Sequence, residues 1–203
     1  MNRTLLLIIL VLIFSPIFIS AIEYKNIKMA SRPAIWQKQL EQDGKDGWRF
    51  IEVSSGWATL IRESDKTPVT YFFAKTFKRF SKYQELIEEK ANEGLRAHGR
   101  YDGRYIFSKY TKSNSKVQNK FTKKALITAR WKKQIEQEGK ESWVLVDIDS
   151  GWFIFVKENT QAIDYNFVKS FSNSKKRLQQ IKTEGKENWI YLFKHGGWLI
   201  FAK

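Results

Sequence analysis

Residues 131–157 read WKKQIEQEGKESWVLVDIDSGWFIFVK, and this stretch decides the fold. Trp131 and Ile135 stand four residues apart, which is typical of the apolar face of a short helix. Gly139 follows where a helix would end in a left-handed cap, a conformation that glycine adopts without steric cost. The remainder has runs of aromatic and β-branched residues, 143–148 and 152–157, on the two sides of an Asp-Ser-Gly turn, which is a hairpin signal. The stretch therefore predicts a helix followed by a β-hairpin.

The same pattern occurs four times. One copy runs from Trp36 through Gly44 to Gly56-Trp57, and the last runs from Ile181 through Gly185 to Gly197-Trp198. A degenerate copy starts at Tyr83. The hairpin glycines fall at positions 56, 103, 151 and 197, so the spacings are 47, 48 and 46 residues. A fixed period of this length indicates a repeat protein.

A longer repeat contains the shorter one. Residues 69–77 align with residues 163–171 at an offset of 94, and both segments have the pattern of a strand that links two helix–hairpin copies. A weaker strand pattern over residues 24–29 precedes the first helix. We therefore predict an α+β protein of two tandem ferredoxin-like or related domains. Each has two helices on one face of an antiparallel sheet, and the domains cover residues 23–110 and 125–203.

The segment between these domains, residues 111–124, is predicted to be a basic linker, in which Phe121 could pair onto a sheet. The formal net charge of the chain is +15, and this segment has five lysines and no acidic residue. Such a charge attracts nucleic acid, anionic lipid or acidic cell-surface polymer. The possible anion-binding residues are Lys112, Lys116, Lys120, Lys123 and Lys124. A solvated tether is the other explanation of this lysine run.

The N-terminus is hydrophobic. Residues 5–22 carry no charge, Arg3 precedes them, and Ser15-Pro16 would break a helix. This is the layout of a secretory signal peptide. A membrane anchor and a buried core segment are the alternatives, since a span needs about 20 apolar residues. We predict that residues 1–22 are a signal peptide or an N-terminal membrane anchor.

Residue types that carry out catalysis form no recognisable constellation. There is no cysteine, which excludes thiol nucleophiles and Cys-ligated metals. His98 and His195 have no partner at metal-ligand spacing, so we expect both at the surface or in turns. The pairs Asp147/Asp149 and Glu88/Glu89 lack a predicted cleft. No GxSxG elbow and no glycine-rich phosphate loop occurs. We therefore predict no catalytic, metal-binding or cofactor-binding residue, and no cofactor.

The eight tryptophans occupy three repeat positions: on helices, at strand starts and after the hairpin glycine. Aromatic residues among lysines can stack on single-stranded nucleic acid. A position fixed by the repeat is more simply explained by packing of helix against sheet. The lysines that follow the glycines near each helix end, at positions 45, 140 and 186, suit the negative end of the helix dipole.

The ordered motifs also carry a family resemblance, which covers nearly everything after residue 30. In the first half the matching residues are Trp36, Trp48, Gly56-Trp57, Tyr71, Phe73, Tyr83, Leu95 and Gly103. In the second half they are Trp131, Trp143, Gly151-Trp152, Tyr165, Phe167, Trp189 and Gly196-Gly197-Trp198. The chain resembles a tandem duplication of the bacterial family labelled domain of unknown function 2812. A single copy also resembles a smaller family of unknown function with one strand–helix–hairpin unit. The resemblance implies no enzyme activity, and this chain places its hydrophobic segment first rather than after the domain.

The expected function is a non-catalytic binding or interaction module, secreted, otherwise extracytoplasmic or anchored to a membrane. Its expected partner is a protein or an anionic cell-surface polymer, contacted through a sheet face or an exposed edge strand. Membrane contact is possible through residues 5–22. A basic nucleic-acid-binding protein is the first alternative, and an unrecognised enzyme is the second.

Overall fold

The structure is a computed structural model that describes residues 22–54, 56–110, 117–157 and 160–203. Across these residues a strand–helix–strand–strand unit occurs four times. Unit 1 consists of β1 (Glu23–Lys28), α2 (Pro33–Lys45), β2 (Arg49–Ser54) and β3 (Trp57–Arg62). Unit 2 consists of β4 (Val69–Lys75), α3 (Phe80–Asn92), β5 (Arg96–Tyr101) and β6 (Arg104–Tyr110). Unit 3 consists of β7 (Gln118–Lys123), α4 (Thr128–Lys140), β8 (Val144–Asp149) and β9 (Trp152–Lys157). Unit 4 consists of β10 (Tyr165–Lys169), α5 (Ser174–Gly185), β11 (Ile190–His195) and β12 (Trp198–Ala202).

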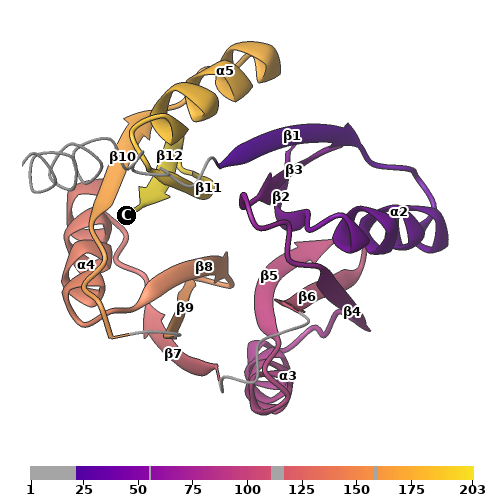
Figure 1. Ribbon diagram of the computed structural model, residues 1–203. Helices are drawn as coiled ribbons and strands as arrows, with labels where there is room; N and C mark the ends of the chain where they lie inside the picture. Colours follow the sequence, from indigo (N-terminus) through magenta and orange to yellow (C-terminus); the bar gives the residue numbers. More distant parts are fainter. Residues whose placement is uncertain (1–21, 55, 111–116, 158–159) are drawn as a thin grey trace, which may run out of the picture.

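Each unit forms one antiparallel sheet of three strands, in the orders β1-β3-β2, β4-β6-β5, β7-β9-β8 and β10-β12-β11. The first strand lies on the outside, and the strand after the helix lies on the inside, next to the axis of a ring (Figure 1). The inner strands β2, β5, β8 and β11 contact their neighbours around this axis. The closed arrangement is like that of a β-propeller, which leaves only short, protected sheet edges.

The α+β class is therefore confirmed, and so are the four helix–hairpin repeats. The prediction of two larger sheets is wrong, because the sheets in the described residues are four and each has three strands. The strand that was assigned to the link between copies is the first strand of the following unit. The weak pattern at residues 24–29 corresponds to β1. Every unit therefore begins with a strand before its helix.

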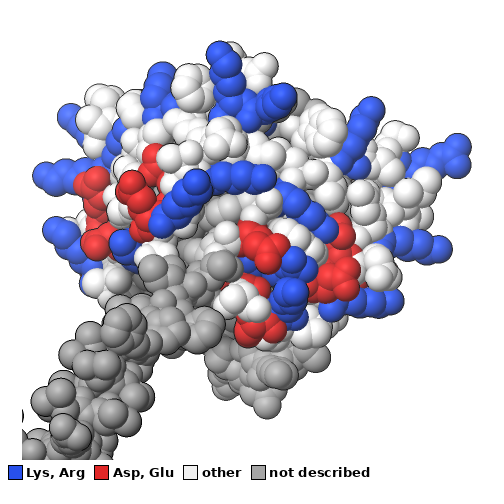
Figure 2. Space-filling model, turned by 45° about the horizontal axis from the view of Figure 1, so that its top comes forward, with Lys and Arg blue, Asp and Glu red and all other residues white. Residues whose placement is uncertain are grey.

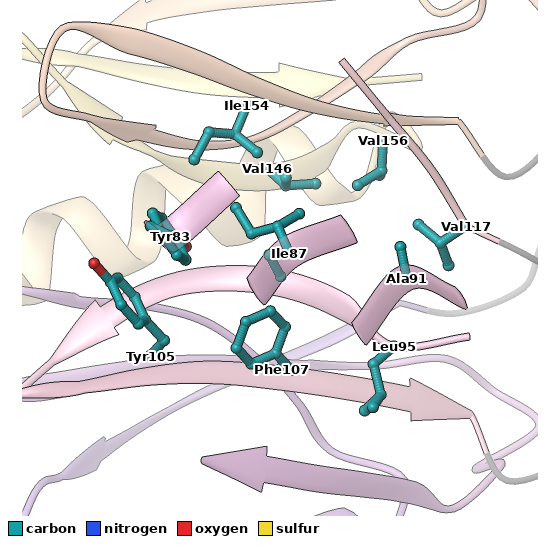
Figure 3. Close-up of a cluster of buried hydrophobic side chains, with 11 residues drawn as sticks. Tyr83, Ile87, Ala91, Leu95, Tyr105, Phe107, Val117, Val146, Ile154 and Val156 are labelled. Atoms are coloured by element: carbon teal, nitrogen blue, oxygen red, sulfur yellow. The ribbon is translucent and has the colours of Figure 1, made fainter. Parts of the chain in front are cut away.

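Each helix packs on the outer strand of the next unit: α2 on β4, α3 on β7, α4 on β10 and α5 on β1. The hydrophobic cores consequently lie between successive units. The cluster drawn in Figure 3 joins Tyr83, Ile87 and Phe107 of unit 2 to Val146 and Ile154 of unit 3. Another cluster joins unit 4 to unit 1 and closes the ring. The cores thus cross the boundary that was predicted between residues 110 and 125.

At three of the junctions between units, a tyrosine of the outer strand makes hydrogen bonds to the backbone of the preceding unit. The Tyr71 hydroxyl donates to the carbonyl of Trp48 (2.8 Å) and accepts from the backbone N–H of Phe50 (2.6 Å). Tyr165 makes the same pair of bonds to Trp143 and Leu145, and Tyr24 makes it to Trp189 and Tyr191. At the junction of units 2 and 3, Asn119 takes this place, and its Nδ2 donates to the carbonyl of Ile87 (3.5 Å).

The glycines near the helix ends have a different role from the one predicted. Gly44 and Gly139 lie inside the last helical turn, and the left-handed residue comes three positions later, for example Gly47 at φ 81° and Ser142 at φ 70°. A Cβ on Gly139 would lie 2.3 Å from the carbonyl oxygen of Ile163 and 2.7 Å from the Tyr165 ring. The glycine is needed because the next unit approaches the helix so closely.

The predicted linker overlaps a strand. Residues 118–123 form β7, which pairs with β9, so Phe121 does join a sheet. Residues 111–116 lie outside the described part of the chain, as does the predicted N-terminal segment apart from Ile22. No helix within the described residues is long and apolar enough to cross a membrane.

Candidate functional site at the axial cavity

Every inner strand carries a bulge where it pairs with the middle strand. The register shifts lie between Phe50 and Glu52, Ala97 and Arg100, Leu145 and Asp147, and Tyr191 and Phe193. A bulge bends the strand and redirects a side chain. The residues at the bulge are Ile51, His98, Val146 and Leu192, and all of them line the axis of the ring. The repeat therefore supplies four equivalent positions that meet at the centre.

A cavity of about 160 Å³ opens along the axis, on the side where the inner strands end. We call this side, which holds the hairpin turns, the hairpin end of the ring. Apolar residues from β2, β8 and β11 form part of the wall. The charged and titratable residues of the wall are Glu52, His98, Arg100, Asp147, Lys194 and His195. Around the axis β2 and β8 each lie between β5 and β11, so Glu52 and Asp147 reach the cavity from opposite sides.

Glu52 is held by groups of unit 4. One carboxylate oxygen accepts from the Tyr191 hydroxyl at 2.5 Å, and the other accepts from the backbone N–H of Lys194 at 3.1 Å. Burial raises the pKa of Glu52, and the positive charges of Arg177 and Lys194 oppose that shift. Arg177 is only 6% exposed and occupies the helix position that is aromatic in the other units. A buried positive charge thus stands near the half-buried carboxylate at the junction that closes the ring.

Asp147 is held in a similar way from units 2 and 3. Its Oδ1 accepts from the backbone N–H of Ile148 at 2.8 Å, and its Oδ2 accepts from the Tyr83 hydroxyl at 3.2 Å. Burial raises the pKa of Asp147 to about 6. Gly99 makes room for this carboxylate, because a Cβ there would lie 3.0 Å from Oδ1. The hydrogen bonds fix the carboxylate in place before any ligand arrives.

His98 lines the axis between this cavity and a narrower one of about 20 Å³ on the other side. The smaller space has room for about one water molecule. The Nε2 atom of His98 is 2.6 Å from the Oγ of Ser108, which is buried. Burial lowers the pKa of His98 well below its usual value, and the guanidinium groups of Arg96 and Arg49 add to the effect. His98 is thus neutral at pH 7.

The prediction that both histidines lie at the surface or in turns is wrong for His98. His195 ends β11 immediately before the hairpin turn, as expected, and lies beside the Trp131 ring at 5.7 Å between centroids. Burial and Lys124 lower the pKa of His195. Asp149 belongs to β8 and is buried 3.4 Å from Arg100, so its carboxylate is paired. The described residues contain no group of three His, Asp or Glu side chains that could hold a metal ion.

The predicted anion-binding lysines do not form one flexible run. Lys112 and Lys116 lie outside the described residues. Lys120 is in β7, and its Nζ is 2.6 Å from Glu138 and 3.4 Å from Glu141. Lys123 ends β7, and the Nζ of Lys124 donates to the carbonyl of Ala125 at 3.4 Å.

The tryptophans divide into packing classes. Trp36 and Trp131, on helices, are buried between units, whereas Trp57, after a hairpin turn, is 41% exposed. Trp48 and Trp143, before inner strands, are covered by the basic residue that ends the middle strand. The Arg62 guanidinium lies 4.4 Å from the Trp48 ring, and the Lys157 Nζ lies 5.6 Å from the Trp143 ring. Such cation–π contacts are one reason why a basic residue occurs at this repeat position in both units.

The sequence did not indicate Glu52 as a site residue, and it predicted no cavity beside Asp147. A signal was present in the repeat alignment. The position occupied by Glu52 and Asp147 holds Gly99 in unit 2 and Phe193 in unit 4, so it departs from the packing pattern of the repeat. Acidic residues are rarely buried without a partner, and such departures mark functional positions.

Comparison of the chain with protein-family models, with curated proteins and with solved structures finds no match. The resemblance to the family labelled domain of unknown function 2812 therefore stays a prediction.

Proposed function

We propose that this chain is a non-catalytic binding module that acts outside the cytoplasm and takes a small primary amine into its axial cavity. The observation that carries the proposal is the pair of carboxylates, Glu52 and Asp147, that face this cavity from opposite sides. Half-buried carboxylates with raised pKa values in a cleft are characteristic of functional sites. An ammonium group between them would supply a positive charge and further hydrogen-bond donors to both carboxylates.

Two further features support a small ligand. The cavity of about 160 Å³ is far larger than the roughly 15 Å³ that one water requires. The carboxylates are already oriented by tyrosine hydroxyls and backbone N–H groups, so binding would cost little side-chain entropy. The apolar part of the wall, from residues such as Val53 and Ile148, suits a short carbon chain attached to the amine.

The test is a titration of the ¹⁵N-labelled protein at pH 7.5 with three probes of equal size: propylamine, propanol and propionate. The backbone N–H groups of Ile148 and Lys194 donate to Asp147 and Glu52, so their NMR signals report on the site. We expect saturable shifts at both amides with propylamine alone. Equal shifts with all three probes, or no shift with any of them, would refute the amine site. The shifts are expected to weaken as the pH falls through about 6, where Asp147 becomes protonated.

The variant Asp147→Asn provides the matched loss of function, and Glu85→Gln, at a surface ion pair with Lys82, provides the control. The Asp147 pKa of about 6 in the folded chain lies above its value of about 3.9 when unfolded. Its stabilising contribution is therefore complete below about pH 4 and is lost as the pH rises through about 6. Asp147→Asn should raise the free energy of unfolding above pH 6, by roughly 2–3 kcal/mol. Loss of amine binding in this variant would therefore not result from unfolding.

The extracytoplasmic location is supported by the uncharged residues 5–22 behind Arg3. Mass spectrometry of the protein from its native host is expected to find either a chain that starts near Ile22 or the full chain in the membrane fraction. Intact Met1 in the soluble cytoplasmic fraction would contradict both forms of the proposal.

Nucleic-acid binding is the second candidate, and the charge of +15 is the observation that favours it. Figure 2 shows lysine and arginine side chains spread over the surface in view, with the carboxylates gathered in smaller patches. Sequence-selective oligonucleotide binding that survives high salt would favour this candidate, since phosphate contacts alone are weakened by salt.

A further inference from the structure

The segments in which the helices begin and the segments in which they finish lie at opposite ends of the ring and differ in charge. At the hairpin end, the outer strand of each unit finishes and the helix begins, within the equivalent segments 28–35, 75–82, 123–130 and 169–176. These segments contain twelve Lys and Arg residues and no Asp or Glu. At the other end the helices finish, within segments 41–48, 88–95, 136–143 and 182–189. Those segments contain eleven Asp and Glu residues and five Lys and Arg residues.

This distribution runs against local helix energetics. Acidic side chains are favourable in the first turn of a helix and basic ones in the last turn, by about 0.3–1 kcal/mol each. In every helix of the described chain the first turn lacks an acidic residue. The excess of bases where the helices begin is therefore not a by-product of helix formation, and it adds positive charge to the hairpin end in all four units.

The segments and turns share one end because the outer strand is bonded to the hairpin turn in every unit. The N–H groups of Met29, Thr76, Lys124 and Ser170 donate to the carbonyls of Gly56, Gly103, Gly151 and Gly197 at 2.9–3.0 Å. The inner strands leave for these turns from around one cavity. The basic segments therefore surround the mouth of the axial cavity.

Large apolar side chains are exposed at the same end. They come from all four units: Ile35, Trp57, Phe77, Leu126, Ile127 and Phe171. Leu126 is 94% exposed, Ile127 is 56% exposed and Phe171 is 52% exposed. Exposed apolar residues scattered singly need no explanation, but apolar residues grouped among bases around one end mark an interaction site.

We infer that the hairpin end is a docking surface for an anionic lipid bilayer. Lysines and arginines next to a membrane surface gain about 1 kcal/mol each from anionic headgroups. Apolar side chains gain further by entering the boundary between headgroups and acyl chains. A soluble polyanion would bind the basic side chains, but it has no apolar region that could bury aliphatic side chains such as Leu126 and Ile127. The combination of both residue types favours the bilayer.

The docking surface is distinct from the hydrophobic N-terminal segment. Strand β1 starts at Glu23 at the acidic end and runs to Lys28 at the hairpin end, so Ile22, the first described residue, lies at the acidic end. A probe at each end can therefore separate docking by the hairpin end from attachment through residues 5–22. The proposal is also independent of the amine site, which can fail while the docking surface holds.

The test uses the full chain, which has no cysteine and so accepts a single engineered label. Phe171→Cys at the hairpin end and Gln137→Cys at the acidic end each carry a polarity-sensitive fluorophore. With vesicles of phosphatidylglycerol and phosphatidylcholine, we expect a blue shift of the emission from position 171 and none from position 137. Vesicles of phosphatidylcholine alone should leave the label at 171 unchanged.

A charge reversal supplies the matched variants. Lys175→Glu with Lys176→Glu lies in the exposed first turn of α5, where acidic residues favour the helix, so the fold should be retained. We expect partitioning at least about tenfold weaker. Lys186→Glu, at the acidic end, should leave it unchanged. A blue shift at position 137, a shift at 171 that does not depend on anionic lipid, or an unaffected charge-reversed variant would overturn the proposal. Binding of an oligonucleotide without any lipid-induced shift would do the same.

Discussion

Gly139→Ala is expected to destabilise the ring by about 2–3 kcal/mol, in the upper part of the range of about 1–3 kcal/mol for overpacking a close contact. The added methyl group would lie 2.3 Å from the Ile163 carbonyl oxygen and 2.7 Å from the Tyr165 ring. Neither group can move freely, because the Ile163 N–H donates to the Gly139 carbonyl (2.8 Å) and the Tyr165 hydroxyl is bonded twice to unit 3. Urea denaturation followed by circular dichroism measures the loss.

Unit 2 shows how the chain accommodates alanine at this position. Ala91 stands where the other units have glycine, Asn119 replaces the tyrosine, and the corresponding Val117–Ala91 backbone bond is longer at 3.4 Å. Tyr165→Asn should therefore relieve part of the cost of Gly139→Ala. We expect a favourable coupling of at least about 1 kcal/mol in the double-mutant cycle. Strictly additive losses would mean that the glycine and the tyrosine are not a packing pair.

The second large effect is expected at the helix tryptophans. Trp131→Ala should cost about 3–5 kcal/mol, since the side chain is 2% exposed in the core between units 3 and 4. Trp57→Ala is the matched control because that indole is 41% exposed, and its loss should stay within about 1 kcal/mol. For a chain of this size, 1 kcal/mol corresponds to about 2–4 °C in Tm, so differential scanning calorimetry separates the two variants.

Equal losses at the two positions would contradict the division of the tryptophans into packing classes. An unchanged Tm for Trp131→Ala, together with loss of a ligand, would instead assign the helix tryptophans to a binding surface.

The repeat was predictable because its signal is local. Trp131 and Ile135 are four residues apart on one helix, and Gly151 marks a turn between two apolar strands. The outer strands were harder to recognise. β7 has the sequence QNKFTK and only one neighbour in its sheet, so it needs little hydrophobic alternation and looked like a linker.

The ring itself could not be predicted from the repeat. Its cores form between a helix and the outer strand of the following unit, and no periodicity states which units become neighbours. The role of Gly139 was misassigned for the same reason, because the Tyr165 ring that requires it comes from another unit. The sequence showed Asp147 as one of a pair of carboxylates. The cavity that it lines is formed by all four inner strands, so the repeat pattern could not predict it.

The junction between units 4 and 1 has a consequence for the order in which the protein assembles. Tyr24 meets the carbonyl of Trp189 and the N–H of Tyr191, which are 165 and 167 positions away in the chain. Contacts of such long sequence separation form late, because the loop entropy is lost before they add any stability. During synthesis, the side of β1 that packs against α5 stays exposed until α5 has been made. Refolding should therefore show a slow last step in which a nearly complete arc of units becomes a ring, and a chaperone that shields β1 would act during that interval.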